Sequence, residues 1–457
     1  MSPASFLDLP NEIINEICEY LCFHCVHGPG VSCEWAAFDG ETGSATDFDV
    51  IYPPCKQTLA WLCRTSRRMN HVASPILYGF FIEPSFMWTS QRGIKFLHTI
   101  CHRPDLAGNL KHAMLHTYTE VKTEHMPLVC DITERLEMEL PQEWREPKPN
   151  DDIVDYDRGD WVLNTTRIKH EDQAGLRHGF LVDLLLASAP NLEELALDTS
   201  HTTRYGDFMP KRSILPHLKY LHLRPGEYSS SKSFDLGQVE KLLEKAPNLE
   251  KLTIGYCRVI SPSSLAFHNL KYLTIYDSLV FPKNIAQSCK NLQRFSFIYP
   301  YSTKGHRLYR SFILSFTPKA IVEDLEPWNA SLQALRITLG TWPGKQRYHQ
   351  KDMIASLKGF TALRRLDLDE LCLFVGEIED AAPKSLLVDL LPLSIEDVIL
   401  RDVKPHLYPA TRYLHEQACL GEFPSLKEIQ VFDDKAELVK MEDWAAETTS
   451  SSSDITS

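Results

Sequence analysis

The stretch Leu192-Glu193-Glu194-Leu195-Ala196-Leu197 has leucine at its first, fourth and sixth positions, and this spacing recurs along the second half of the chain. Apolar residues at these positions place one side of a short strand inward, and such a strand is stable only when neighbouring units stack on it. The sequence therefore predicts stacked repeats with one strand each. Further units, with Ile, Val or Phe sometimes replacing leucine, start at Leu218, Leu249, Leu270, Leu292, Leu332, Leu363, Ile395 and Leu426.

Segments of helical period precede several of these strands and end at a small or helix-breaking residue. They cover residues 180–190, 239–247 and 285–289. The repeat is therefore helix, turn and strand, which favours an α/β fold. Successive units start 21 residues apart at Leu249 and Leu270 but 40 apart at Leu292 and Leu332, so the repeat is irregular.

This pattern resembles the leucine-rich-repeat proteins over residues 180–432, more than half of the chain. The resemblance implies a solenoid with parallel strands on its concave face and helices on its convex face. The Asn or Cys that ends the strand motif in that family is absent or displaced in most units, and Tyr256-Cys257 is the nearest approach. The registration of the repeats is therefore approximate.

The N-terminal segment predicts two helices. In the first helix, Asp8 can be the N-cap and Pro10 suits the first turn. Its apolar residues, from Leu9 through Ile13 and Ile14 to about Leu21, recur at helical spacing and form a stripe. The second covers residues 58–70, and Pro75 is expected to break or restart it. The apolar stripe of the first helix must pack against another apolar surface, either the core of this chain or a partner protein.

These residues resemble the F-box: Leu-Pro-x-Glu-Ile-x-x-x-Ile at 9–17, Leu-x-x-Leu-Cys-x-x-Ser-Arg-Arg at 59–68 and Pro-x-Leu-Tyr at 75–78. In that family the motif docks on the Skp-type adaptor of cullin-based ubiquitin ligases. The resemblance implies a non-catalytic substrate-recognition subunit that reaches the cullin through the adaptor. The adaptor-binding residues it implies are Leu9, Pro10, Ile13, Ile17, Leu59, Leu62, Pro75 and Leu77. The alternative is a repeat scaffold whose N-terminal helices only cap the apolar end of the array.

An insertion at 22–57 separates two helices that most F-boxes join by a few residues. Cys22 and Cys25 have metal-chelating spacing, and Cys33 with Cys55 or His27 could complete a tetrahedral zinc site. A second Cys-x-x-Cys pair is missing, so the favoured interpretation is a loop with incidental cysteines, and no cofactor is expected.

The chain is accordingly divided into a helical motif at 5–80, a connecting region at 81–179, the repeats at 180–432 and a tail at 433–457. The connecting region contains a possible degenerate repeat around 106–115 and an acidic, proline-bearing stretch at 133–160, read as a long loop. The tail is acidic and rich in Ser and Thr, and is expected to be disordered.

The intervening strand positions are expected to face solvent and to form a mixed surface for a target protein. Tyr and Arg dominate the binding energy of many interfaces, so Tyr220, Tyr272, Arg294 and Arg364 are the candidate target contacts. The other positions predicted to be exposed are Glu193, Glu194, Ala196, Lys219, His222, Glu250, Lys251, Thr253, Lys271, Thr274, Gln293 and Ser296.

Composition excludes several other functions. A net charge of −13 disfavours nucleic acid and anionic lipid as partners. The chain has no apolar stretch long enough to span a membrane and no secretory leader, so a cytoplasmic or nuclear protein is expected. No catalytic motif is present in usable form, and His112 and His222 have no carboxylate at a fixed spacing, so both are expected to be structural or solvated.

Overall fold

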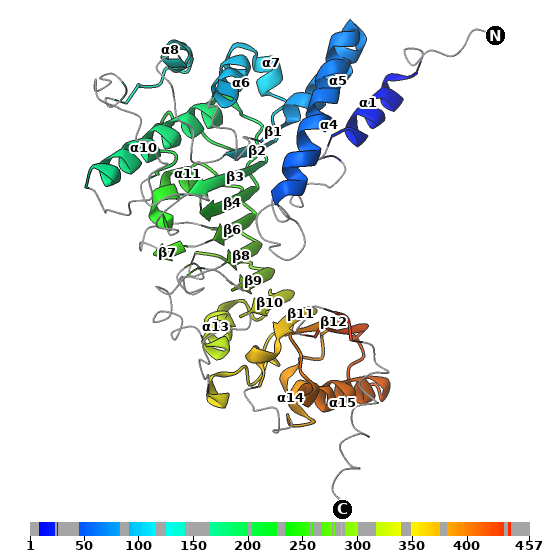
Figure 1. Ribbon diagram of the computed structural model, residues 1–457. Helices are drawn as coiled ribbons and strands as arrows, with labels where there is room; N and C mark the ends of the chain where they lie inside the picture. The colour runs from blue at the N-terminus through cyan, green and yellow to red at the C-terminus, as the bar shows by residue number, and fades with distance from the viewer. Residues whose placement is uncertain are drawn as a thin grey trace, which may run out of the picture. The chain divides into compact units, whose positions relative to one another are not determined.

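The computed structural model describes two compact units, Met1–Leu249 and Glu250–Ser457 (Figure 1). No helix of the described residues is long and apolar enough to cross a membrane. The described residues are 9–22, 25, 45–82, 91–115, 125–141, 144, 165–199, 203–225, 234–255, 257–259, 267–276, 278, 285, 288–299, 317–339, 349–374, 382–433 and 437–439.

An eleven-stranded sheet has the order β1-β2-β3-β4-β6-β8-β9-β10-β11-β12-β13, and the strand pairs within each unit are parallel. The predicted α/β fold is confirmed. The first unit holds β1 (Phe80–Ile82), β2 (His112–Leu115), β3 (Glu194–Thr199), β4 (Tyr220–Pro225) and the short β5 (Phe234–Asp235). The second holds β6 (Lys251–Gly255), β7 (Cys257–Val259), β8 (Tyr272–Tyr276), β9 (Arg294–Ile298), β10 (Ala334–Thr338), β11 (Arg365–Asp369), β12 (Asp397–Arg401) and β13 (Glu428–Val431).

The strands pair in the register that the leucine spacing predicts. Leu195 lies opposite Leu221 in the first unit, and Leu335 lies opposite Leu366 in the second. The carbonyl of the residue immediately before a strand also accepts two backbone N–H groups from the next repeat, as Glu193 before β3 does from Lys219 and Tyr220. The same pair of bonds recurs at every step from Glu250 to Lys427, so successive strands of the second unit are joined in the same way.

Two strands precede the repeats of the predicted array. The possible early unit forms β2, and the carbonyl of Lys111 makes the doubled bond to Glu193 and Glu194. Strand β1 follows helix α5 without an intervening residue and pairs with β2. The sequence pattern did not indicate β1, because Phe80–Ile82 is too short to show a period.

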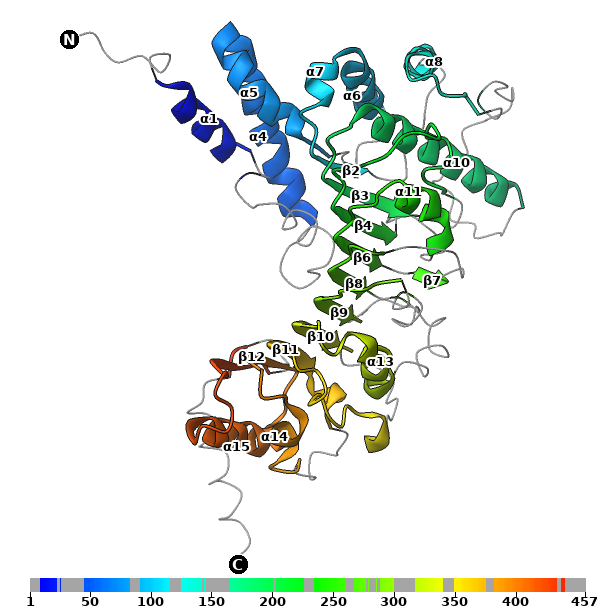
Figure 2. The same ribbon diagram turned by 180° about the vertical axis from the view of Figure 1, so that it is seen from behind.

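Helices cover one side of the strands, as α10 and α11 do for β3 and β4 (Figures 1 and 2). Helix α10 begins at Thr165, earlier than predicted. The prediction missed its first turns because their sequence is mostly polar and lacks apolar residues at helical spacing. The helical elements after β2 are α8 (Met126–Arg135), α10 (Thr165–Ser188), η3 (Leu236–Val239), α11 (Glu240–Glu244), α13 (Pro318–Asp324), η6 (Glu326–Trp328), η7 (Gln350–Asp352), η8 (Glu370–Cys372), α14 (Leu386–Leu390), η9 (Pro405–Leu407) and α15 (Tyr408–Cys419).

Helices α1 (Asn11–Tyr20), α4 (Ala45–Thr65) and α5 (Arg67–Gly79) lie at the N-terminal end, followed after β1 by α6 (Gln91–His102) and α7 (Pro104–Ala107). The predicted second helix is in fact two, because Ser66 interrupts it, and α4 begins inside the predicted insertion. Pro10 is the N-cap of α1 and not part of its first turn, and Asp8 lies outside the described residues.

The prediction that Pro75 ends its helix is wrong, since α5 runs through it to Gly79. A proline within a helix costs about 3 kcal/mol through its missing N–H and its ring. Val72, Ala73 and Ile76 of the same helix are buried in the core that α5 shares with α1 and α4, and this packing offsets the cost.

Two predicted irregular segments fall largely outside the described residues. The acidic stretch is described only as far as α8 and the residues up to Trp144. In the tail, Phe432 and Leu438 form an isolated antiparallel bridge, and residues 440–457 lie outside the described part.

Candidate protein-binding surfaces

Helix α1 carries apolar residues on two sides. Ile14 and Cys18 are fully buried against α4 and α5. Ile13 and Tyr20 are 41% and 74% exposed. Pro10, Ile13, Ile17 and Tyr20 recur at three- and four-residue intervals and therefore lie along one line of the helix, which we call the α1 stripe.

The predicted adaptor-binding residues all belong to the cluster of α1, α4 and α5, but they divide between its core and its surface. Leu59 is 2% exposed and is a core residue. Pro10, Ile13 and Pro75 are exposed, and Ile17 is half-buried. The remaining three, Leu9, Leu62 and Leu77, are partly buried against the core.

Two large exposed side chains of this cluster were missed. Trp61 of α4 is 57% exposed, and Tyr20 is the most exposed large apolar residue of α1. The spacing Ile13, Ile17, Tyr20 could have indicated the tyrosine. Trp61 had no such signal, because it lies within an apolar run whose buried side is not evident from sequence.

The Ser66-Arg67-Arg68 motif holds the cluster together. Ser66 is the N-cap of α5, and its hydroxyl accepts a hydrogen bond of 3.1 Å from the backbone N–H of Met69. The guanidinium of Arg68 donates to the side chain of Asn11 at 2.8 Å and to the carbonyl of Leu9. Arg68 therefore fixes the start of α1 on α5.

Replacing Ser66 with alanine is expected to lower the free energy of unfolding of the first unit by about 1 kcal/mol, since one helix N–H loses its acceptor. Urea unfolding followed by circular dichroism measures the change. Ser385 precedes α14 without a capping bond, so Ser385→Ala is the matched control and should leave stability unchanged. Equal effects of the two substitutions would contradict the capping role.

The predicted exposure of the strand positions is wrong for Glu194, Ala196, His222 and Thr253, which are 3% exposed or less. Ala196 packs in an apolar cluster with Phe80, Ile82 and Met114 from the two strands before it. The strand face of the first unit is therefore filled over β1–β3, and an open target surface is not available there.

Beside that cluster, Glu194 lies between two histidines of the neighbouring strands. Its carboxylate oxygens lie 2.9 Å from Nδ1 of His112 and 3.2 Å from Nε2 of His222. Burial would raise the pKa of Glu194, but the hydrogen bond to His112 and the charge of the two nearby imidazoles outweigh it and hold the pKa far below its usual 4.5. Both histidines are therefore structural, and each has the carboxylate partner that spacing did not indicate.

The strand face of the second unit has exposed charged and aromatic residues. The guanidinium of Arg294 lies 5.4 Å from the ring centroid of Tyr272 on the paired strand, within cation–π range. Arg364 is exposed and lies 3.1 Å from Glu396. Of the four predicted target contacts, Arg294 and Tyr272 are therefore in contact with each other. Arg364 forms a separate ion pair in the same unit, and Tyr220 is half-buried in the first unit.

A further ion group on this face was not predicted. Asp367 is 7% exposed and accepts from Arg401 at 2.7 and 3.2 Å, while Arg336 lies at 3.4 Å. The three residues come from adjacent strands β10, β11 and β12, so their contact could not be predicted from their spacing along the chain. The group fixes two arginines on the strand face.

The zinc candidates are only partly placed. Cys22 is buried, Cys25 is exposed and Cys55 is half-buried, whereas Cys33 lies outside the described residues. Hydrogen bonding to the Cys22 side chain raises the pKa of the Cys25 thiol. Over the ranges that the structure describes, these cysteines do not form a converging group of three metal ligands.

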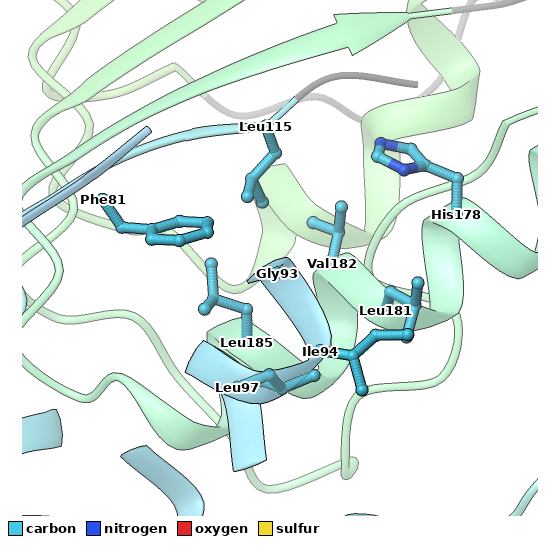
Figure 3. Close-up of a pocket in the computed structure, with 9 residues that line it drawn as sticks. All are labelled: Phe81, Gly93, Ile94, Leu97, Leu115, His178, Leu181, Val182 and Leu185. Carbon is cyan, nitrogen blue, oxygen red and sulfur yellow. The ribbon is translucent and has the colours of Figure 1, made fainter. Parts of the chain in front are cut away.

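An apolar pocket lies in the first unit between β1, β2, α6 and α10 (Figure 3). Among the described residues that line it, His178 is the only one with a polar side chain, and the centroid of its ring lies 6.0 Å from that of Tyr205 in an edge-to-face arrangement. A small-molecule site ordinarily adds several convergent polar groups to an apolar lining. The remaining lining residues are Phe81, Gly93, Ile94, Leu97, Leu115, Leu181, Val182 and Leu185.

The α1 stripe and the strand face of the second unit are thus the two surfaces of the described residues that fit macromolecular binding best. Both present side chains common at protein interfaces, and neither brings together a nucleophile and a general base. No family model matches the chain, and no curated protein matches it.

Proposed function

We propose that the chain is a substrate-recognition subunit of a cullin-based ubiquitin ligase. Helices α1, α4 and α5 act as an F-box that docks a Skp-type adaptor, and the strands and helices from β2 onward act as a leucine-rich-repeat solenoid that binds a target protein. The observation that carries the proposal is the α1 stripe, which lies in the segment that resembles the F-box. No covalent step belongs to this chain.

The two-sided character of α1 supports the adaptor site. A surface helix ordinarily buries one apolar side and exposes a polar one. Here Ile14 and Cys18 already face the core, so Ile13, Ile17 and Tyr20 need a second apolar surface to be buried. Packing an amphipathic helix into a partner's groove provides such a surface.

The proposed target site is the strand face of the second unit. Arg294 of β9 and Arg365 of β11 are exposed and lie on either side of Ala334 of β10, and the guanidinium of Arg294 lies over the ring of Tyr272. Exposed guanidinium groups on a rigid sheet favour a target with carboxylate or phosphate groups. Residues at these exposed positions can vary without disturbing the core, which is formed by the inward apolar residues of the strands.

Ile13→Asp is expected to weaken adaptor binding by about a hundredfold, since it places a charge in the centre of the α1 stripe. Titration calorimetry of the full-length chain with a Skp-type adaptor measures this. Ile214 is 63% exposed and lies outside the helical cluster, so Ile214→Asp is the matched control and should bind normally. Absence of adaptor binding by the folded wild-type chain would reject the ligase function.

The second candidate is a repeat scaffold whose N-terminal helices cap the first strand. It is favoured by the direct passage from α5 at Gly79 into β1 at Phe80, with no linker between them. A cap predicts that Ile14→Asp, in the buried side of α1, lowers the unfolding midpoint, and that the folded wild-type chain binds no adaptor. A docking surface predicts adaptor binding by the wild-type chain that Ile13→Asp weakens without lowering the unfolding midpoint.

A further inference from the structure

Two histidines of α6 and one aspartate of α8 converge at the surface of the first unit. His98 and His102 are one helical turn apart, and their rings lie 4.2 Å apart at 32°. The Nε2 atoms lie 3.3 Å and 3.0 Å, respectively, from Oδ2 of Asp131. All three donor atoms are within 4.8 Å of one another.

The geometry of this group is not that of hydrogen bonds. Oδ2 of Asp131 is shielded from solvent and accepts no hydrogen bond within the described residues, although both imidazole nitrogens are close. The ring N–H directions therefore miss the oxygen. In a tetrahedral site with ligands at about 2.0–2.1 Å, neighbouring ligand atoms are about 3.3 Å apart, and the two measured distances are close to that value.

The tautomer of His102 also favours a bound cation. Its Nδ1 lies 3.0 Å from the carbonyl oxygen of His98, which only accepts, so Nδ1 carries the proton of the neutral ring. Nε2 of the neutral ring then carries a lone pair and no proton, so it cannot donate to the carboxylate oxygen 3.0 Å away. A cation bound by both atoms would offset the repulsion between these two acceptors. A hydrogen bond from the second ring nitrogen to a backbone carbonyl is the usual support of a metal-bound histidine.

We propose that His98, His102 and Asp131 bind a divalent transition-metal ion such as Zn²⁺. The group offers two imidazoles and a carboxylate, a ligand set that zinc and its neighbours in the first row accept. The three side chains are 33%, 34% and 45% exposed, so the ion is reached from solvent and water completes its coordination. The site would join α6 to α8, and it is independent of the proposed ligase function.

The test is a calorimetric titration of the reduced full-length chain with zinc chloride at pH 7.5. We expect one tight equivalent that is lost in His102→Gln and in Asp131→Asn, with binding weakened by about a hundredfold. His71→Gln and Asp389→Asn change exposed residues elsewhere and are the matched controls, which should retain the tight equivalent. Cys22→Ser with Cys25→Ser separates this site from zinc held by cysteine.

Cobalt(II) supplies a second readout that does not depend on stability. Nitrogen and oxygen ligands give visible absorption without the strong near-ultraviolet band of thiolate ligands, and the signal should disappear in His102→Gln. Binding should also weaken as the buffer is made more acidic, because protons compete with the metal ion for its ligands. If the wild-type chain and the double variant His98→Gln with His102→Gln bind the same number of zinc ions with the same affinity, the proposal is wrong.

Discussion

Replacing Glu194 with alanine is expected to lower the free energy of unfolding of the first unit by about 3–5 kcal/mol, the usual cost of removing one partner of a buried ion pair. Glu194 and His222 are each 1% exposed, and His112 is 8% exposed. Without the carboxylate, both imidazoles lose their anionic partner in a site that water does not reach. The loss is measured by urea unfolding and located by hydrogen exchange in β2, β3 and β4.

Glu193 provides a matched control for this prediction. It is the preceding residue, and its carboxylate pairs with Lys111 at 3.1 Å on the surface, where an ion pair contributes about 1 kcal/mol or less. Glu193→Ala should therefore leave stability nearly unchanged. If Glu194→Ala were no more destabilising than Glu193→Ala, the buried group would not be an ion pair that stabilises the fold.

The same carboxylate makes stability depend on pH in a defined direction. The pKa of Glu194 is lower in the folded state than the 4.5 of an ordinary glutamate. Its stabilising effect is therefore complete above pH 4.5 and is lost as the pH falls below that value toward the folded-state pKa. Glu194→Gln removes this titration, so the acid-induced loss of stability should be smaller in the variant than in the wild type.

The leucine spacing predicted the sheet accurately because it is a local property. In the repeats before the last, the first, fourth and sixth apolar residues are buried, as Leu195 and Leu366 are, whereas Leu426 and Ile429 of the last repeat are half-buried. A strand that slipped by one residue would expose these side chains, so the spacing also fixes the register. Neighbouring strands are parallel because the helical part of each repeat returns the chain to the end of the sheet at which the previous strand began.

The functional surfaces could be predicted only in part, because they depend on contacts between distant residues. Glu194 and His112 are 82 positions apart along the chain. Similarly, the spacing of His98 and His102 is visible in the sequence, but Asp131 comes from another helix, α8. The burial of Ala196 depends on β1, whose three residues straddle the predicted boundary between the helical motif and the connecting region. Local sequence patterns therefore predict the strands of the sheet, but not which side chains from distant segments pack on the strand face.

Trp328→Ala is expected to lower the free energy of unfolding of the second unit by about 3–5 kcal/mol, the range for removing a large buried aromatic side chain. Trp328 is 2% exposed at the end of η6, and its indole N–H donates to the carbonyl of Cys289 at 3.1 Å. The substitution leaves a cavity and also a buried carbonyl without its donor. Urea unfolding measures the change, and hydrogen exchange in β9 and β10 locates it.

The size of this effect follows from the position of Trp328 in the irregular array. It lies in the repeat that ends with β10, whose strand motif starts 40 residues after the preceding one at Leu292. The indole reaches the segment just before β9, and the Ser331 hydroxyl donates to the carbonyl of Leu292 at 2.9 Å beside it. Trp328→Phe keeps most of the volume and should cost about 1–3 kcal/mol for the lost hydrogen bond. Trp61→Ala removes an exposed indole and should leave stability unchanged, while a loss as large as that of Trp328→Ala would contradict the packing role.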